Sequence, residues 1–217
     1  MKPGLIIFDC DGVLVDSEAA MNTLLSENLA RFGLSLSPEA CLTKFKGGSM
    51  LDVPKFAAEC GVTLPESWVE DFYRELYTLF EEQGVSVIDG IPALLKTLEN
   101  AQIPYCVASN GSEEKMSITL GQNGLWDRFR NACFSAHTYG AKKPDPTIFL
   151  AAAERFGVAP ETVLVIEDSW SGSRAARTAG MPCLGLSLEG DGAELAAEGA
   201  IVIHTIQDVY DHIGAGS

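Results

Sequence analysis

Apolar runs that end abruptly in polar residues recur along this chain of 217 residues. A continuous apolar run is typical of a strand buried on both faces of a parallel sheet, whereas apolar residues at a spacing of three or four predict a helix. The predicted strands cover residues 5–8, 104–108, 132–134, 162–166, 182–186 and 200–203. The predicted helices cover residues 18–32, 38–45, 50–60, 65–83, 91–100, 112–123, 146–156 and 171–179.

The order of these elements changes along the chain. Residues 17–83 are predicted almost wholly as helix, while strands and helices alternate after Gly90, as a parallel sheet with helical crossovers requires. We therefore expect an α/β fold in which a Rossmann-like parallel sheet carries an inserted α-helical domain. The predicted core domain comprises residues 1–16 and 85–217, and the predicted helical domain comprises residues 17–84.

Two carboxylates, Asp9 and Asp11, follow the first predicted strand. Side chains alternate along a strand, so we expect both to leave the strand end on the same side. Two acids this close cannot both be ionised in an apolar setting without a counter-charge, so one is protonated or a cation is present. The alternative is a simple turn or helix cap after the strand, which an Asp-Gly pair such as Asp11-Gly12 often forms.

Three further polar clusters also follow apolar runs or lie between them. Ser109 and Asn110 end the run at 104–108, and Glu167 and Asp168 end a later one. A turn-rich segment between them carries two adjacent lysines. Because the carboxyl ends of parallel strands line one crevice, we expect these clusters to converge. Together they supply carboxylates, a hydroxyl, an amide and an ammonium, a set that suits a divalent cation beside a phosphate group.

The order of these motifs resembles that of the haloacid dehalogenase superfamily. The segment 9–18, with the sequence DCDGVLVDSE, is similar to the subgroup of small phosphatases and β-phosphoglucomutases that have a helical C1-type cap. The resemblance runs over nearly the whole chain. It implies a haloacid dehalogenase-like core and makes residues 17–84 the cap that closes over the active site.

The resemblance also implies a reaction and the residues that perform it. It implies a magnesium-dependent phosphatase, with Mg²⁺ held near the carboxylates and an aspartyl-phosphate intermediate. The roles it assigns are nucleophile for Asp9, general acid and base for Asp11, phosphate binding for Ser109, Asn110 and Lys143, and metal binding for Asp9, Asp11 through its backbone carbonyl, Glu167 and Asp168. The Lys-Pro step of the family pattern selects Lys143, and we interpret Lys142 as a solvated surface charge.

Departures from related patterns narrow the reaction. Dehalogenases of the superfamily lack the second aspartate and phosphonate hydrolases replace it, so Asp11 argues against both. The related mutases carry a histidine on the first cap helix, where this chain has residues 19–22, AAMN. We therefore favour a phosphatase. A sugar phosphomutase remains one alternative, and a non-catalytic binding or regulatory domain on the same fold remains another.

Specificity is expected to come from the cap, because the core motifs handle only phosphate. The segment 45–49, FKGGS, resembles the family's substrate loop, with Lys46 and Gly47 as candidate substrate-binding residues. The alternative for this segment is a helix C-cap with a solvated lysine. The chain is also similar to phosphatases that act on sugar phosphates and phosphorylated sugar acids, 6-phosphogluconate among them.

Composition and charge limit the partners. The formal net charge is −15, which disfavours nucleic acids and anionic membrane surfaces and leaves a small phosphorylated metabolite as the expected partner. No apolar run approaches the roughly 18 residues that a membrane span requires. The six cysteines show no metal-ligand spacing, and we interpret them as reduced core residues. The first residues lead straight into a strand, so we expect no signal peptide and a cytoplasmic location. We also expect a monomer.

Overall fold

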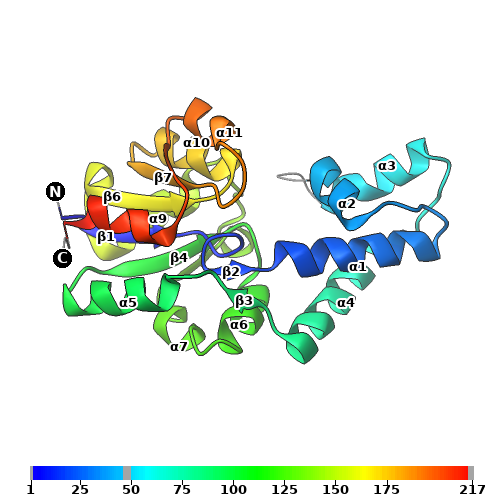
Figure 1. The fold of residues 1–217 in the computed structure, drawn as a ribbon, viewed down its shortest axis with the longest axis horizontal. Helices are drawn as coiled ribbons and strands as arrows, with labels where there is room; N and C mark the ends of the chain where they lie inside the picture. The colour runs from blue at the N-terminus through cyan, green and yellow to red at the C-terminus, as the bar shows by residue number, and fades with distance from the viewer. Residues whose placement is uncertain (1, 46–49, 215–217) are drawn as a thin grey trace. The chain divides into compact units, whose positions relative to one another are not determined.

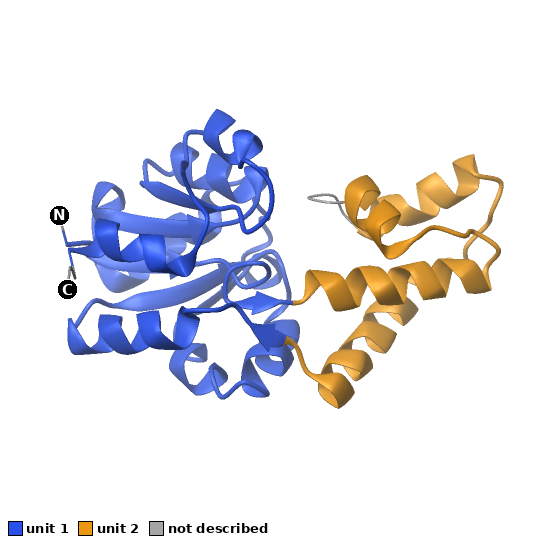
Figure 2. Ribbon diagram, viewed as in Figure 1, with its two compact units in different colours: residues 1–16, 86–217 blue, residues 17–85 orange. Residues whose placement is uncertain are grey.

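The computed structural model describes residues 2–45 and 50–214. The chain forms two compact units, which Figure 2 distinguishes by colour. Residues 1–16 and 86–217 form one, here called the core unit, and residues 17–85 form the other, here called the helical unit. Within the described ranges, no helix is both long and apolar enough to cross a membrane.

A parallel sheet organises the core unit (Figure 1). Among the described residues it has six strands in the order β5-β4-β1-β6-β7-β8. The strands are β1 (Leu5–Phe8), β4 (Tyr105–Ser109), β5 (Cys133–Ser135), β6 (Val163–Glu167), β7 (Cys183–Leu186) and β8 (Ile201–Ile203). The chain leaves β1 to one side for β4 and β5 and then returns to its other side for β6. A ligand is therefore expected at the carboxyl end of β1, beside the ends of its neighbours β4 and β6.

Helices follow the strands and cover both faces of the sheet. In the core unit they are α5 (Ile91–Asn100), α6 (Glu113–Gly121), α7 (Trp126–Phe129), α8 (Ala136–Tyr139), α9 (Thr147–Phe156), α10 (Trp170–Thr178), α11 (Ala193–Ala197) and α12 (Tyr210–Ile213), with 3₁₀ turns η2 (Pro160–Thr162) and η3 (Ile206–Val209). Leu5 and Ile7 belong to a buried cluster with α9, α10 and α11, whereas Phe8 packs edge-on against Phe129 of α7. The prediction of a parallel α/β sheet is thus confirmed.

The helical unit contains α1 (Glu18–Arg31), α2 (Pro38–Phe45), η1 (Met50–Asp52), α3 (Val53–Glu59) and α4 (Trp68–Gln83). Four apolar residues of α4 recur every fourth position, and all are buried: Trp68, Phe72, Leu76 and Phe80. This spacing places them on one helical face, which explains why the segment forms a helix that packs on its neighbours. The strands β2 (Val15–Asp16) and β3 (Ser86–Val87) of the core unit pair antiparallel, so the two connecting segments are joined by a short ladder.

Some element boundaries differ from the prediction for identifiable reasons. One helix over residues 50–60 was expected, but the segment begins as a 3₁₀ turn and becomes α-helical only at Val53. Pro54 explains this, because proline is tolerated in the first turn of a helix and not in its interior. The helix expected from residue 65 begins at Trp68, after a turn closed by the hydrogen bond from Trp68 N–H to the Pro65 carbonyl.

Candidate active site

Asp9 lies directly after β1, at the point where the strand order reverses. Its backbone N–H donates to the Ile166 carbonyl of β6 at 2.9 Å, so the residue is held beside β6 at the carboxyl ends of the central strands. Its side chain is almost completely buried. A carboxylate in this position needs polar partners, because burying an unpaired charge is strongly unfavourable.

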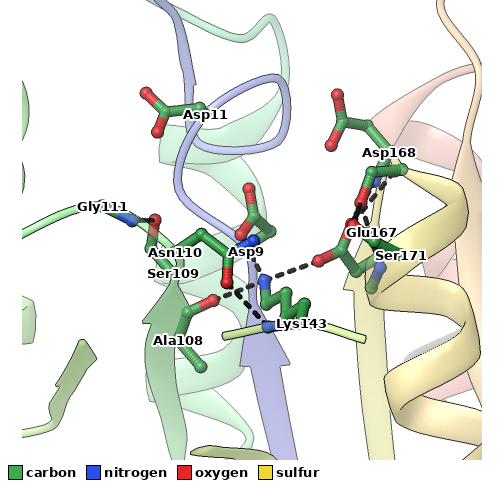
Figure 3. Close-up of polar contacts among 12 residues, drawn as sticks. Asp9, Asp11, Ala108, Ser109, Asn110, Gly111, Lys143, Glu167, Asp168 and Ser171 are labelled. Carbon is green, nitrogen blue, oxygen red and sulfur yellow. Dashed lines mark hydrogen bonds and ion pairs between the residues drawn. The ribbon is translucent and has the colours of Figure 1, made fainter. Parts of the chain in front are cut away.

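Lys143 supplies the main partner, and Figure 3 shows its side chain between the ends of β1, β4 and β6. Its Nζ donates to Oδ1 of Asp9, to Oε1 of Glu167 at 2.5 Å and to the Ala108 carbonyl at 2.8 Å. The side chains of Lys143 and Glu167 are only 2% and 1% exposed. One buried ammonium is therefore shared by two carboxylates, which leaves this cluster with an excess of one negative charge when all three groups are ionised.

The protonation behaviour of the cluster follows from this crowding. Burial, together with the neighbouring charges of Glu167 and Asp11, raises the pKa of Asp9 to about 7 against the opposing effect of Lys143. Burial by itself would lower the pKa of the Lys143 ammonium, but Asp9 and Glu167 outweigh it and hold that pKa above its usual range. An additional positive charge beside Asp9 would therefore favour its ionised form.

Glu167 is a positioning residue for Lys143 in this structure. Its Oε2 accepts hydrogen bonds from the backbone N–H groups of Asp168 and Ser169, both at 3.0 Å, and from the Ser169 hydroxyl at 2.8 Å. A Cβ at Gly172 would lie 1.8 Å from Oε1, so α10 has room for this carboxylate only because residue 172 is glycine. Both oxygens of Glu167 thus have protein partners, and its expected role as a metal ligand stays a prediction.

Asp11 follows a different course from Asp9. The strand ends at Phe8, so its alternation does not extend to residue 11, and the expectation that both carboxylates leave on the same side stays a prediction. The Asp11 Oδ2 instead accepts a hydrogen bond from Nζ of Lys115 in α6 at 2.8 Å. Figure 3 shows the carboxylates of Asp9 and Asp11 pointing to different places. The lysine that holds Asp11 was missed by the sequence reasoning.

Asp168 lies over the turn that follows β1. A Cβ at Gly12 would lie 2.1 Å from its Oδ2, and Gly12 has a φ of +80°, which side chains other than glycine rarely adopt. Glycine at this position therefore lets the backbone of the first motif approach the Asp168 carboxylate. An Asp-Gly pair is visible in the sequence, but the partner that approaches it is 156 residues away in the chain.

The expected phosphate-binding residues lie at the end of β4. The Ser109 hydroxyl is buried and accepts a hydrogen bond from the Gly111 N–H at 2.9 Å, so its own hydrogen can be donated elsewhere. The side-chain Oδ1 of Asn110 accepts from the backbone N–H of Lys143 at 2.8 Å and ties the lysine segment to this loop. Lys142, in contrast, is exposed. The candidates Lys46 and Gly47 lie outside the described residues.

The oxygen atoms at this edge suit a hard cation such as Mg²⁺. Asp9, Asp168 and the Asp11 carbonyl belong to the segments that the turn at Gly12 brings together. Within the described ranges, no three Asp, Glu, His or Cys side chains cluster closely enough to hold a metal by themselves. Mg²⁺ takes one or two protein carboxylates and completes its shell with water and substrate phosphate. The donors present therefore fit the ion.

Comparison with known proteins identifies the family. The family model described as haloacid dehalogenase-like hydrolase matches residues 6–186. The chain belongs to this family. It is similar to 6-phosphogluconate phosphatase of Escherichia coli, with 34% identity over 81% of this chain and 79% of that protein. It is also similar to phosphoglycolate phosphatase of Xanthomonas campestris, with 30% identity over 83% of this chain and 81% of that protein.

A solved structure agrees with the family. A haloacid dehalogenase-like protein of unknown function from Agrobacterium tumefaciens matches with a TM-score of 0.84 and 34% identity, covering 98% of both chains. The two named relatives act on different phosphate esters, yet both are phosphatases. This haloacid dehalogenase-like chain is accordingly a phosphoric monoester hydrolase.

Proposed function

We propose that this hydrolase is a magnesium-dependent phosphatase of small phosphorylated metabolites that forms an aspartyl-phosphate on Asp9. The observation that carries the proposal is the buried Asp9 carboxylate at the end of β1, held by Lys143 in a cluster with excess negative charge. A carboxylate that is fixed at a sheet edge and crowded by like charge is suited to attack an electrophile once a cation is bound.

In the first step, an oxygen of Asp9 attacks phosphorus and the bond from phosphorus to the leaving oxygen breaks. Asp11 gives a proton to that leaving oxygen, so the substrate departs as an alcohol. Lys143, the Ser109 hydroxyl and the Asn110 backbone N–H hold the oxygens of the transferring group. Ser109 and Asn110 lie at the end of β4, and the Asn110 side chain ties the Lys143 backbone to this loop, which keeps the donors in place while negative charge moves.

In the second step, Asp11 takes a proton from a water molecule that attacks the phosphorus of the acyl phosphate. Asp9 is then released as a carboxylate together with inorganic phosphate. Dividing the reaction at Asp9 replaces one difficult displacement by two easier ones. Mg²⁺, held by Asp9, Asp168 and the Asp11 carbonyl, would supply shielding of the negative charges that otherwise repel each other.

The substrate we propose is a sugar phosphate or a phosphorylated sugar acid. The 6-phosphogluconate phosphatase relative supports this class, and the phosphoglycolate phosphatase relative supports a phosphorylated acid more generally. We also propose that the helical unit acts as a cap that sets specificity. The cytoplasmic location, the monomeric state and the absence of nucleic-acid and membrane partners stay predictions.

The experiment that tests the function measures phosphate release from a panel of phosphorylated sugars, sugar acids and glycolate, with Mg²⁺ or with EDTA. We expect release with Mg²⁺ only, and none from an Asp9→Asn variant, while Asp16→Asn, which changes an exposed carboxylate, keeps activity. Borohydride reduction during turnover should convert Asp9 to homoserine, which peptide mass spectrometry detects. Isomerised product that requires a bisphosphate would instead favour the mutase, and Mg²⁺ binding without turnover would favour the binding domain.

A further inference from the structure

Lys115 is a cation of the site that the reaction described above does not use. It is the third residue of α6, and its Nζ lies 2.8 Å from Asp11 Oδ2, although the two residues are 104 positions apart. The Lys115 side chain is 12% exposed and that of Asp11 is 25% exposed. Lysine side chains are usually solvated, whereas this one is largely buried and its ammonium contacts Asp11.

The stability of α6 does not explain why a lysine stands at this position. The N-terminus of a helix carries a partial positive charge that favours Asp and Glu, as at Glu113 and Glu114, and disfavours a cation. The helix is already capped, because the Ser112 hydroxyl accepts a hydrogen bond from the Lys115 N–H at 3.1 Å. The ammonium therefore acts against the helix and in favour of its contact with Asp11.

The contact lies beside the loop to which phosphate binding is assigned. A Cβ built on Gly111 would lie 3.3 Å from Ser109 Oγ, 3.4 Å from Lys115 Cδ and 3.8 Å from Asp11 Oδ2. The lysine stem, the Asp11 carboxylate and the Ser109 hydroxyl thus gather around the same glycine. Lys115 keeps the Asp11 carboxylate next to the group that would hold the phosphate.

We infer that Lys115 is a positioning residue that holds Asp11 beside the leaving oxygen of the substrate. The inference rests on the proposed function, in which Asp11 gives its proton to that oxygen. As the proton moves, negative charge develops on Asp11, and Lys115 is already in place to stabilise it. The bond from phosphorus to the leaving oxygen breaks in the same step, while the new bond from Asp9 to phosphorus forms.

The test compares two leaving groups. An alkyl phosphate such as a sugar phosphate needs a proton on its leaving oxygen, whereas p-nitrophenyl phosphate releases a stable anion and needs little help. General acid catalysis contributes on the order of a hundredfold or more. Both substrates pass through the same acyl phosphate, so the test follows release of the alcohol or phenol in a single turnover, which reports the first step alone. We therefore expect Lys115→Met to lower this rate for the alkyl phosphate by about tenfold or more, to lower it for p-nitrophenyl phosphate by less than about threefold, and to leave KM nearly unchanged. Lys115→Arg should restore most of the loss.

Controls separate this inference from the proposed function. Lys96→Met removes an exposed lysine of α5 and should change neither substrate's kcat. Asp11→Asn should show the same preference for the good leaving group more strongly, and Lys115→Met added to it should cost little more. An equal loss on both substrates, or a rise in KM alone, would overturn the role of Lys115. Should Asp11→Asn itself show no leaving-group preference, the proposed role of Asp11 fails first.

Discussion

The core unit and the helical unit each contain a buried polar cluster, but the charges in the two clusters are arranged differently. In the helical unit, the Trp68 indole N–H donates to Oδ1 of Asn28 at 2.8 Å, and the Asn28 amide donates to Glu75 at 2.9 Å. Arg31 then pairs with Glu75 at 2.5 Å, and both of these charged side chains reach solvent. Every charge in this cluster has an opposite partner.

The cluster around Lys143 is the opposite case. Two buried carboxylates share one buried ammonium, and nothing in the three residues balances the remaining negative charge. Such an arrangement costs stability unless a cation or ligand compensates it. A buried polar cluster with balanced charge thus supports a fold, whereas one with an excess of like charge marks a place where something binds.

The largest effect is expected from removing the ammonium that Asp9 and Glu167 share. Lys143→Met should leave the buried carboxylates of Asp9 and Glu167 without the ammonium that they share, so we expect the free energy of unfolding to fall by about 3–5 kcal/mol. Phosphate release should be lost as well. Urea unfolding and a phosphate assay measure the two effects, with Lys142→Met at the exposed neighbour as the matched control. A Lys143→Met protein as stable as the wild type would contradict the account of the cluster.

Removing the nucleophile should have the opposite effect on stability. An acid whose pKa is raised on folding stabilises the folded state at low pH. For Asp9 this contribution is lost as the pH rises from 3.8, the ordinary pKa of the group, to about 7, its pKa in the folded protein. In EDTA at pH 8, we therefore expect Asp9→Asn to unfold at a higher urea concentration than the wild type. The free energy of unfolding should be higher by about 1–3 kcal/mol, with a smaller difference at pH 5.

Asp16→Asn is the control for this stability measurement, because it removes an exposed carboxylate and should change little. A lower unfolding midpoint for Asp9→Asn than for the wild type at pH 8 would show that the like charges do not strain the cluster.

In the helical unit, a substitution should affect stability alone. Asn28→Ala would leave the buried indole N–H of Trp68 without its acceptor, so we expect a loss of about 1–2 kcal/mol. Release of phosphate from p-nitrophenyl phosphate, measured well below the unfolding temperature, should be unchanged. Gln83→Ala, at an exposed position of α4, serves as the control for the unfolding measurement. If both variants unfolded at the same temperature, the Asn28 contacts would not contribute to the stability of the helical unit.

The smallest effect is expected at a charged cluster of the core unit that lies near the surface. Glu198 accepts hydrogen bonds from Arg174 at 2.5 and 3.0 Å and pairs with Arg177 at 2.9 Å. The hydrogen bonds from Arg174, aided by the charges of Arg174 and Arg177, lower the pKa of Glu198 below its ordinary 4.5. The stabilisation is therefore present above pH 4.5 and is lost as the pH falls through the lowered pKa.

Glu198→Gln should accordingly be slightly less stable than the wild type at pH 7, and the difference should shrink at pH 3. Thermal unfolding at the two pH values measures this. A difference that grows on acidification would show that the sign of the argument is wrong.

The sheet was the most predictable part of the fold. Continuous apolar runs located β1, β4 and β6 to within one residue at either end, because strands buried on both faces have no polar positions to confuse the pattern. Short elements such as β2, β3, α7 and α8 were not predicted, since two to four residues carry too little periodicity to detect.

The candidate site was predictable in its residue types and less so in their contacts. Asp9, Glu167 and Lys143 were identified from motifs, and the structure brings them together. The hydrogen bonds from Lys143 and Ser169 to Glu167 were not predicted. In the sequence, a carboxylate next to a second carboxylate resembles a metal ligand whether or not other side chains bind it. Lys115 could have been noticed as a cation in the first turn of a predicted helix, where it is unfavourable.

The amino-acid sequence was enough to locate the six strands of the parallel sheet and the acids and hydroxyl at their carboxyl ends, because burial pattern and turn chemistry are local properties. Only the tertiary structure decided which of these groups meet. Lys143 reaches Asp9 and Lys115 reaches Asp11 across more than a hundred residues, and the Gly12 turn accepts Asp168 from the end of the neighbouring strand β6. Such contacts depend on strand order, helix register and the space left by missing side chains, and these are settled only when the whole chain packs.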